Sequence, residues 1–309
     1  MERFDNWMSY SFDDGPVNGE KQHPFSKFKL YFKKGFKVKQ LNYFDALFHN
    51  AAVVRDSYSE PFDVFLSGGI DSEIMVRVNH DLGIKQNVVI VRMEDNHNIQ
   101  DFTAAMHICN DLGIKPTIID WNLRRFMEND AYDCYQRTFC PLIGRMVRWA
   151  WFDLVDNIPV FGEGEPYWQR ETDDYSDAPL DVWKFHWHED FFTTAFQANI
   201  SKRTVIGEWY NYTPEPVMAY HHMPLAQDLF ADKFRGLKDC WPIRIKIHKQ
   251  LWPEILDREK LVGYEGAGAP HTYPDFMADF QKHVMAENIK TGNTRYKYTR
   301  QQLENIFNG

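Results

Sequence analysis

Two hydrophobic periods alternate through the middle third of the chain. Four short apolar runs predict strands at residues 63–66, 88–93, 117–121 and 158–161. Between these runs, apolar residues recur every three or four positions, which predicts helices over residues 72–82, 99–112 and 138–155. Strands that alternate with helices predict an α/β fold with a doubly wound, mostly parallel sheet.

The segments that flank this core follow less regular patterns. Near the N-terminus, residues 29–32 and 36–40 are candidate strands around a Lys-Lys-Gly turn, and residues 43–54 are a candidate helix. The last part of the chain is aromatic and acidic, with helices expected near its end. We therefore predict three regions: a small N-terminal cap (1–60), an α/β core (61–164) and a helical, aromatic C-terminal region packed on that core (165–309).

Composition and charge restrict the classes of protein to which the chain can belong. The 309 residues are 44% hydrophobic and 26% charged, and the formal net charge is −9, which makes a nucleic-acid partner unlikely. The apolar runs are far shorter than the roughly 18 residues of a membrane span, and no secretory signal follows Met1. The four cysteines form no CxxC pair. We expect a cytoplasmic protein with no membrane partner.

The sequence SGGIDS, at residues 67–72, joins the first predicted strand of the core to its helix. In an open parallel sheet, ligands bind at the carboxyl ends of the strands. Gly68 and Gly69 leave main-chain amides unshielded, Ser67 and Ser72 add hydroxyl donors, and the helix dipole favours an anion at the same point. Asp71 would repel a phosphate unless it binds Mg²⁺ or orients the loop. A strand-to-helix turn with a serine N-cap is the simpler alternative.

The chain resembles the PP-loop ATP pyrophosphatases, which have the adenine nucleotide alpha hydrolase fold and whose defining loop is SGGxDS. The sequence contains neither GxxxxGK[ST] nor GxGxxG. The segments "VFGEGEPYW" and "IKIHKQLWPEILDREKLVGYE" are similar to later motifs of one branch, the synthetase domain of asparagine synthetase and the β-lactam synthetases. The resemblance spans residues 43–265 and implies ATP and Mg²⁺ as cofactors.

The resemblance also implies roles for individual residues. Glu163 matches a glutamate that acts as a base or orients the nucleophile, and Lys246 matches a lysine that neutralises charge during adenylation. Asp71 and Glu165 are the candidate Mg²⁺ ligands, with Glu165 standing in for a family acidic residue whose position Pro166 occupies. The residues expected to bind the nucleotide are Ser67, Gly68, Gly69, Asp71, Ser72, Val91, Met93 and Gly162; main-chain groups at the end of the second core strand would meet adenine.

The function implied by the resemblance is an ATP-dependent ligase that forms AMP and pyrophosphate. Such an enzyme adenylates a carboxyl or carbonyl group of a small-molecule substrate and transfers it to a nitrogen nucleophile. No glutaminase domain is recognisable here, so free ammonia, a separate amidase or an amine substrate would supply the nitrogen. Two alternatives stay open at this point: a non-catalytic module that binds ATP or AMP, and a PP-loop enzyme that modifies a nucleobase.

Overall fold

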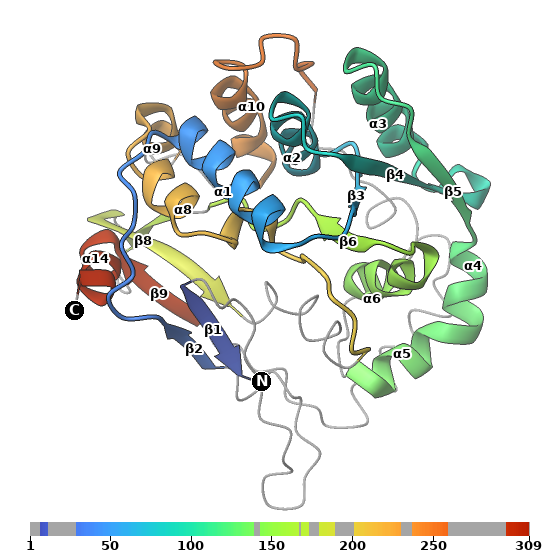
Figure 1. The fold of residues 1–309 in the computed structure, drawn as a ribbon, viewed down its shortest axis with the longest axis horizontal. Helices are drawn as coiled ribbons and strands as arrows, with labels where there is room; N and C mark the ends of the chain where they lie inside the picture. The colour runs from blue at the N-terminus through green and yellow to red at the C-terminus, as the bar shows by residue number, and fades with distance from the viewer. Residues whose placement is uncertain are drawn as a thin grey trace, which may run out of the picture.

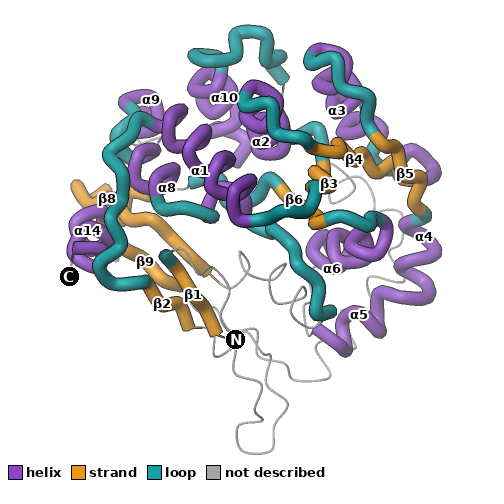
Figure 2. The backbone as a smooth tube through the Cα atoms, in the orientation of Figure 1, coloured by secondary structure: helices purple, strands orange, loops and turns teal. Residues whose placement is uncertain are grey.

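The structure is a computed structural model of the 309-residue chain (Figures 1 and 2). It describes residues 7–11, 29–138, 143–166, 168–172, 179–188, 201–229, 237–258 and 295–308. Within these ranges, no helix combines the length and the apolar character that a membrane span requires.

A four-stranded parallel sheet forms the centre of the fold, in the order β5-β4-β3-β6. Its strands are β3 (Phe62–Phe65), β4 (Gln86–Met93), β5 (Thr117–Trp121) and β6 (Ile158–Phe161). β3 pairs on one side with β4 and on the other with β6, so the strand order reverses at β3. All four residues of β3 and of β6 are buried. The predicted α/β fold with a parallel sheet is confirmed.

Helices cover both faces of this sheet (Figure 1). α1 (Tyr43–Ser57), α2 (Ile70–Asp81) and α3 (Ile99–Asp111) lie on one side, and α6 (Ile143–Ala150) lies on the other. The helix predicted over residues 138–155 is wrong in extent. Instead, α4 (Leu123–Arg125), a π-helical turn and α5 (Ala131–Thr138) precede α6, and a 3-10 turn follows it; residues 139–142 lie outside the described part.

The N-terminal region contributes a pair of antiparallel strands, and the predicted turn at Lys34 and Gly35 is present after the second of them. β2 (Lys29–Phe32) pairs antiparallel with β1 (Met8–Ser11). The strand predicted at residues 36–40 is wrong, because this segment runs without strand pairing toward Asn42, the residue that caps α1. Asn42 Oδ1 accepts a hydrogen bond of 2.9 Å from the Asp45 N–H, which satisfies an otherwise orphan amide at the start of the helix.

The C-terminal region contains an antiparallel sheet in addition to its helices. β7 (Trp168–Thr172), β8 (Pro179–His188) and β9 (Arg295–Thr299) form an antiparallel sheet in that order. Its strands lie apart from the parallel sheet (Figure 1). The described helices of this region are α8 (Glu215–Tyr220), α9 (Pro224–Leu229), α10 (Leu237–His248) and α14 (Arg300–Asn308).

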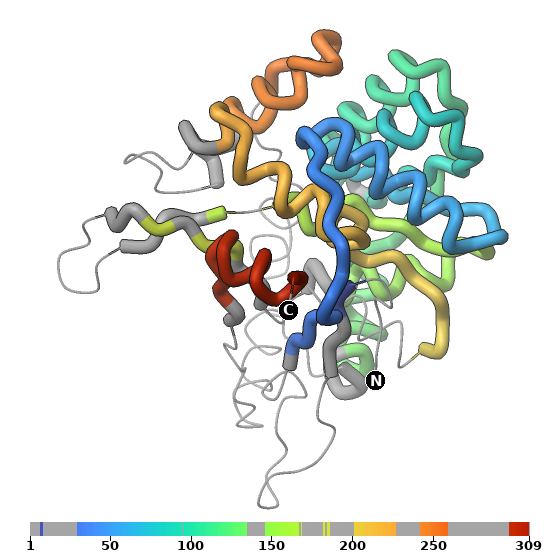
Figure 3. Tube along the Cα trace, turned by 60° about the vertical axis from the view of Figure 1, so that its left-hand side comes forward, coloured from blue at the N-terminus to red at the C-terminus, as the bar shows by residue number. Residues whose placement is uncertain are grey.

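The described segments near the two ends of the chain pack against each other (Figure 3). Phe307 of α14 lies 5.7 Å from Trp7 and 6.2 Å from Phe32 between ring centroids. Trp7 is fully buried, and its indole N–H donates to the Asn211 carbonyl oxygen at 3.1 Å. These contacts join the N-terminal strands to the C-terminal elements.

Candidate functional site

The loop at residues 67–72 leaves the carboxyl end of β3 and turns into α2 without a side-chain cap. Gly69 is the N-cap residue of α2, and within the described part of the chain no capping side chain bonds the first helical amides; the Gly69 N–H itself donates to Ser67 Oγ at 3.3 Å. Ser67 and Ser72 bond each other across the loop, with 3.0 Å between their Oγ atoms. Ser72 Oγ also donates to the Gly69 carbonyl oxygen at 3.0 Å. Because both hydroxyls brace the loop, Ser72 does not cap the helix, and its positive end stays open to an anion.

Two glycines bring neighbouring elements close to this loop. Gly68 has φ +80°, and a Cβ there would collide with the Asp101 carbonyl oxygen of α3. A Cβ on Gly162, just after β6, would lie 2.7 Å from Ser72 Cα. Glycine is therefore required at both positions for the packing of the strand ends around α2.

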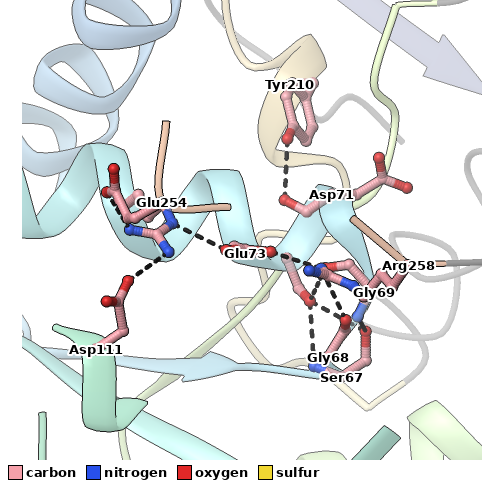
Figure 4. Close-up of polar contacts among 11 residues, drawn as sticks. Ser67, Gly68, Gly69, Asp71, Glu73, Asp111, Tyr210, Glu254 and Arg258 are labelled. Atoms are coloured by element: carbon pink, nitrogen blue, oxygen red, sulfur yellow. Dashed lines mark hydrogen bonds and ion pairs between the residues drawn. The ribbon is translucent and has the colours of Figure 1, made fainter. Parts of the chain in front are cut away.

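Buried ion pairs fix the first turns of α2 (Figure 4). Arg77 Nε donates to Glu73 Oε1 at 2.9 Å, and the other guanidinium nitrogens reach Asp111 and Glu254 at 2.7 Å each. Arg258 Nη2 donates to Glu73 Oε2 at 2.5 Å and to the Gly68 carbonyl oxygen at 3.1 Å. Glu73 and Arg77 are 1% and 2% exposed. The loop is thus held from α2, α3 and the segment after α10.

A cavity of about 160 Å³ opens beside the loop, between the ends of β3, β4 and β6. One wall is apolar: Phe65 and Phe161 stack with ring centroids 4.7 Å apart, and Trp151 stacks on Phe65 at 5.9 Å. The other side is polar. The predicted site residues that line the cavity are Ser67, Gly69, Asp71, Ser72, Val91, Gly162 and Glu163.

Met93 is buried and lies outside the cavity wall, whereas Asn98, which sequence reasoning missed, lies in that wall. Asn98 Nδ2 donates to the Val91 carbonyl oxygen, and the Met93 N–H donates to Asn98 Oδ1, at 2.8 Å each. These two main-chain groups are the ones predicted to meet adenine. Both are already hydrogen-bonded to the same side chain.

The two predicted Mg²⁺ ligands, Asp71 and Glu165, both bind the guanidinium of Arg244 in α10. His248 Nε2 lies 2.9 Å from Glu165 Oε1. Burial, helped by the nearby Arg244 charge, lowers the pKa of the His248 imidazole to about 3, so it is neutral at neutral pH. Burial also lowers the pKa of Arg244 to about 10, which leaves its guanidinium charged. Arg244 therefore compensates both carboxylates.

This arrangement does not fit a resident Mg²⁺ held by Asp71 and Glu165. A guanidinium lies between the two carboxylates, and the Asp71 carboxylate points away from Ser67 and Gly68 (Figure 4). Among the described residues, no group of three or more histidine, cysteine or acidic side chains could hold a metal ion. Mg²⁺ binds proteins mainly through carboxylates together with substrate phosphates. Within the described part of the chain, a metal that arrives with ATP would be held mainly by the phosphates.

We expect the nucleotide-free protein to bind no Mn²⁺, used as a spectroscopic substitute for Mg²⁺, because Arg244 neutralises the carboxylates. Electron paramagnetic resonance of free Mn²⁺ checks this directly: the signal should be undiminished by the parent protein. Arg244→Gln, which frees Asp71 and Glu165, should reduce the signal. Binding of Mn²⁺ by the parent that is lost in Asp71→Asn would contradict the expectation.

Glu163, the predicted base, lines the cavity and forms an ion pair with Arg148 of α6. Its side chain is 19% exposed and that of Arg148 is 25% exposed. The cavity thus holds a carboxylate and a guanidinium side by side, next to the Gly162 turn. Arg148 was not found from the sequence, although it belongs to the helix predicted there.

The structure does not bring Lys246 to the cavity. Lys246 is exposed on α10, whereas Arg244 and His248, four residues apart, share the face that contacts Glu165. Residues two apart on a helix point in nearly opposite directions, so Lys246 and Arg244 cannot serve the same site. The sequence feature that could have identified Arg244 is its position four residues before His248, in a helix whose residues Ile245 and Ile247 are buried.

Comparisons with known proteins give no family and no curated relative: no family model matches the chain, and no curated protein matches it. An NMN synthetase from Francisella tularensis is 13% identical over 82% of this chain and 98% of that chain, with a TM-score of 0.32. An NH3-dependent NAD synthetase from Campylobacter jejuni is 14% identical over 80% of this chain and 95% of that chain, with a TM-score of 0.30. Similarity at this level says nothing about the function of this chain. The fold class follows from the parallel sheet itself.

Proposed function

We propose that the protein is an ATP-dependent ligase that releases AMP and pyrophosphate. The observation that carries the proposal is the uncapped start of α2 in the SGGIDS loop, which faces a cavity at the reversal of strand order. Ligands bind at this point in open α/β sheets, and a helix start with free amides favours phosphate. The apolar wall around Phe65 suits a purine ring, and the polar wall suits the phosphates.

The reaction that fits this cavity proceeds in two steps. A carboxylate oxygen of the substrate attacks the α-phosphorus of ATP, the bond to the β-phosphate breaks, and pyrophosphate leaves. A nitrogen nucleophile then attacks the acyl carbon, AMP leaves, and Glu163 accepts the proton of the nitrogen. A base positioned in this way contributes about 10² to 10⁴ in rate. Arg148, paired with Glu163, supplies positive charge in the same cavity.

A module that binds ATP or AMP without catalysis remains the alternative that one observation favours. The two carboxylates predicted to hold Mg²⁺ are both compensated by Arg244, and Lys246 lies away from the cavity. A binding module would need the loop and the cavity but neither Glu163 nor Arg148. The two functions therefore differ in whether pyrophosphate is formed.

The experiment is to incubate the protein with the Mg²⁺ complex of ATP, ammonium ion and pools of small carboxylic acids, and to follow inorganic pyrophosphate. We expect pyrophosphate and AMP to accumulate with at least one pool and an amide to appear by mass spectrometry. ADP and phosphate as the products would contradict the proposed reaction. Tight ATP binding with no pyrophosphate from any pool would favour the binding module.

A further inference from the structure

Beyond the end of β3, the last residues of β4 have main-chain groups on the side of the loop that are not paired with β3. The Leu66 N–H donates to the Val89 carbonyl oxygen at 2.9 Å, and this is the final main-chain hydrogen bond between the β3 segment and β4 in the direction of the loop. β3 ends at Phe65, whereas β4 continues to Met93. Main-chain groups two residues apart point to the same side of a strand. The Val91 carbonyl and the Met93 N–H therefore point into the space above the loop, where none of the described strands meets them.

Asn98 closes this edge with a single amide group. Its two hydrogen bonds to Val91 and Met93 are 2.8 Å long, and the residue is 9% exposed. Asn98 is also the N-cap residue of α3, where an asparagine usually bonds the helix amides, but it makes no such bond here. The side chain is thus turned away from its own helix and toward β4.

The donor and acceptor of the Asn98 amide match those of an adenine edge. An amide presents an N–H donor beside a carbonyl acceptor. Adenine presents its N6 amino group beside the N1 acceptor, whereas hypoxanthine presents a carbonyl beside an N–H, which reverses the pattern. The Val91 carbonyl and the Met93 N–H therefore complement an adenine ring as well as they complement the Asn98 amide. The Met93 N–H can donate to only one of these two partners at a time, so adenine and Asn98 compete for it.

We propose that the Asn98 side chain is a displaceable gate on the nucleobase subsite, which holds the β4 edge closed until an adenine ring replaces it. This inference rests on the proposed function, because it takes ATP as the ligand of the cavity. Displacement of Asn98 breaks its two buried hydrogen bonds to β4, and this free-energy cost weakens the binding of the nucleotide. Removal of the gate therefore tightens the binding of adenine nucleotides and leaves hypoxanthine nucleotides unaffected.

The test is a calorimetric titration of ATP and of ITP, the hypoxanthine analogue, into the parent protein, Asn98→Ala and Asn98→Ser. Serine can cap α3 in the usual way, so this second variant is expected to fold even if alanine does not. We expect ATP to bind about tenfold more tightly to both variants, the scale of one to two hydrogen bonds, while ITP changes less than about twofold. Gln100→Ala, an exposed position on α3, is the matched control and should leave both affinities unchanged.

The outcomes separate this inference from the proposed function. ATP affinity that is equal to or weaker than the parent value in folded Asn98 variants overturns the gate and leaves the proposed function standing. An equal gain for ATP and ITP also overturns it, because the edge then does not discriminate between the rings. If neither the parent nor any variant binds ATP, the proposed function fails, and the gate fails with it.

Discussion

Gly69→Val is expected to abolish ATP binding while the protein stays folded. A Cβ at this position would meet one atom within 4 Å, Ser67 Oγ at 3.4 Å, and the φ angle of −74° suits any residue. The valine branches would therefore extend into the cavity that Gly69 lines. Calorimetry should show a loss of affinity of about 100-fold or more, because the phosphate can no longer approach the α2 amides.

The control for Gly69→Val is the same substitution with a smaller side chain. Gly69→Ala should weaken ATP binding less than valine does, and thermal unfolding of both variants should stay close to that of the parent. A substitution at Gly68 is unsuitable for this purpose, because its positive φ and the nearby Asp101 carbonyl would disturb the fold itself. Unchanged ATP affinity in folded Gly69→Val would mean that phosphate does not bind at this loop.

Glu163→Gln should reduce amide formation by about 10²-fold or more and leave ATP affinity close to the parent value. Glutamine keeps the size of the side chain and the Gly162 turn but cannot accept the proton of the nitrogen nucleophile. Adenylation precedes that proton transfer, so the exchange of labelled pyrophosphate into ATP should fall less than product formation. Both rates are measured with the carboxylic acid that supports pyrophosphate release.

Two further variants show whether the effect of Glu163→Gln is specific. Glu60→Gln changes an exposed carboxylate before β3 and should leave both rates unchanged. Arg148→Gln removes the ion-pair partner of Glu163 and should lower amide formation without abolishing it, because the carboxylate remains in the cavity wall. Equal amide formation by Glu163→Gln and the parent would remove this residue from the mechanism and support the binding module.

Local patterns were sufficient to predict the parallel sheet and the loop. The buried runs of β3, β4 and β6 and the glycines of SGGIDS are contiguous in sequence, and their roles follow from periodicity and from main-chain geometry. The extent of the helix before β6 was harder to predict, because its apolar spacing continues across a 3-10 turn that ends at Leu154. Periodicity does not distinguish the two kinds of helix.

The charged partners of the site could not be predicted, because they come from distant segments. Arg244 meets Asp71 across 173 positions of the chain, and Arg258 meets Gly68 across 190. The resemblance directed attention to Lys246, which lies two residues from Arg244 and on another face of α10. Only the packing of α10 against the core decides which of these cations reaches the carboxylates. Asn98 was missed because its residue type suits a helix cap equally well.

The most direct test of the phosphate-binding loop is nuclear magnetic resonance of protein labelled with ¹⁵N-glycine, titrated with ATP and separately with pyrophosphate. Gly68 and Gly69 lie in the loop, whereas Gly35, Gly83 and Gly113 lie in turns away from the cavity. We predict that both ligands shift the amide signals of Gly68 and Gly69 and leave those of the other three in place. Amide signals of Gly68 and Gly69 that stay unchanged at saturating ATP would contradict the account.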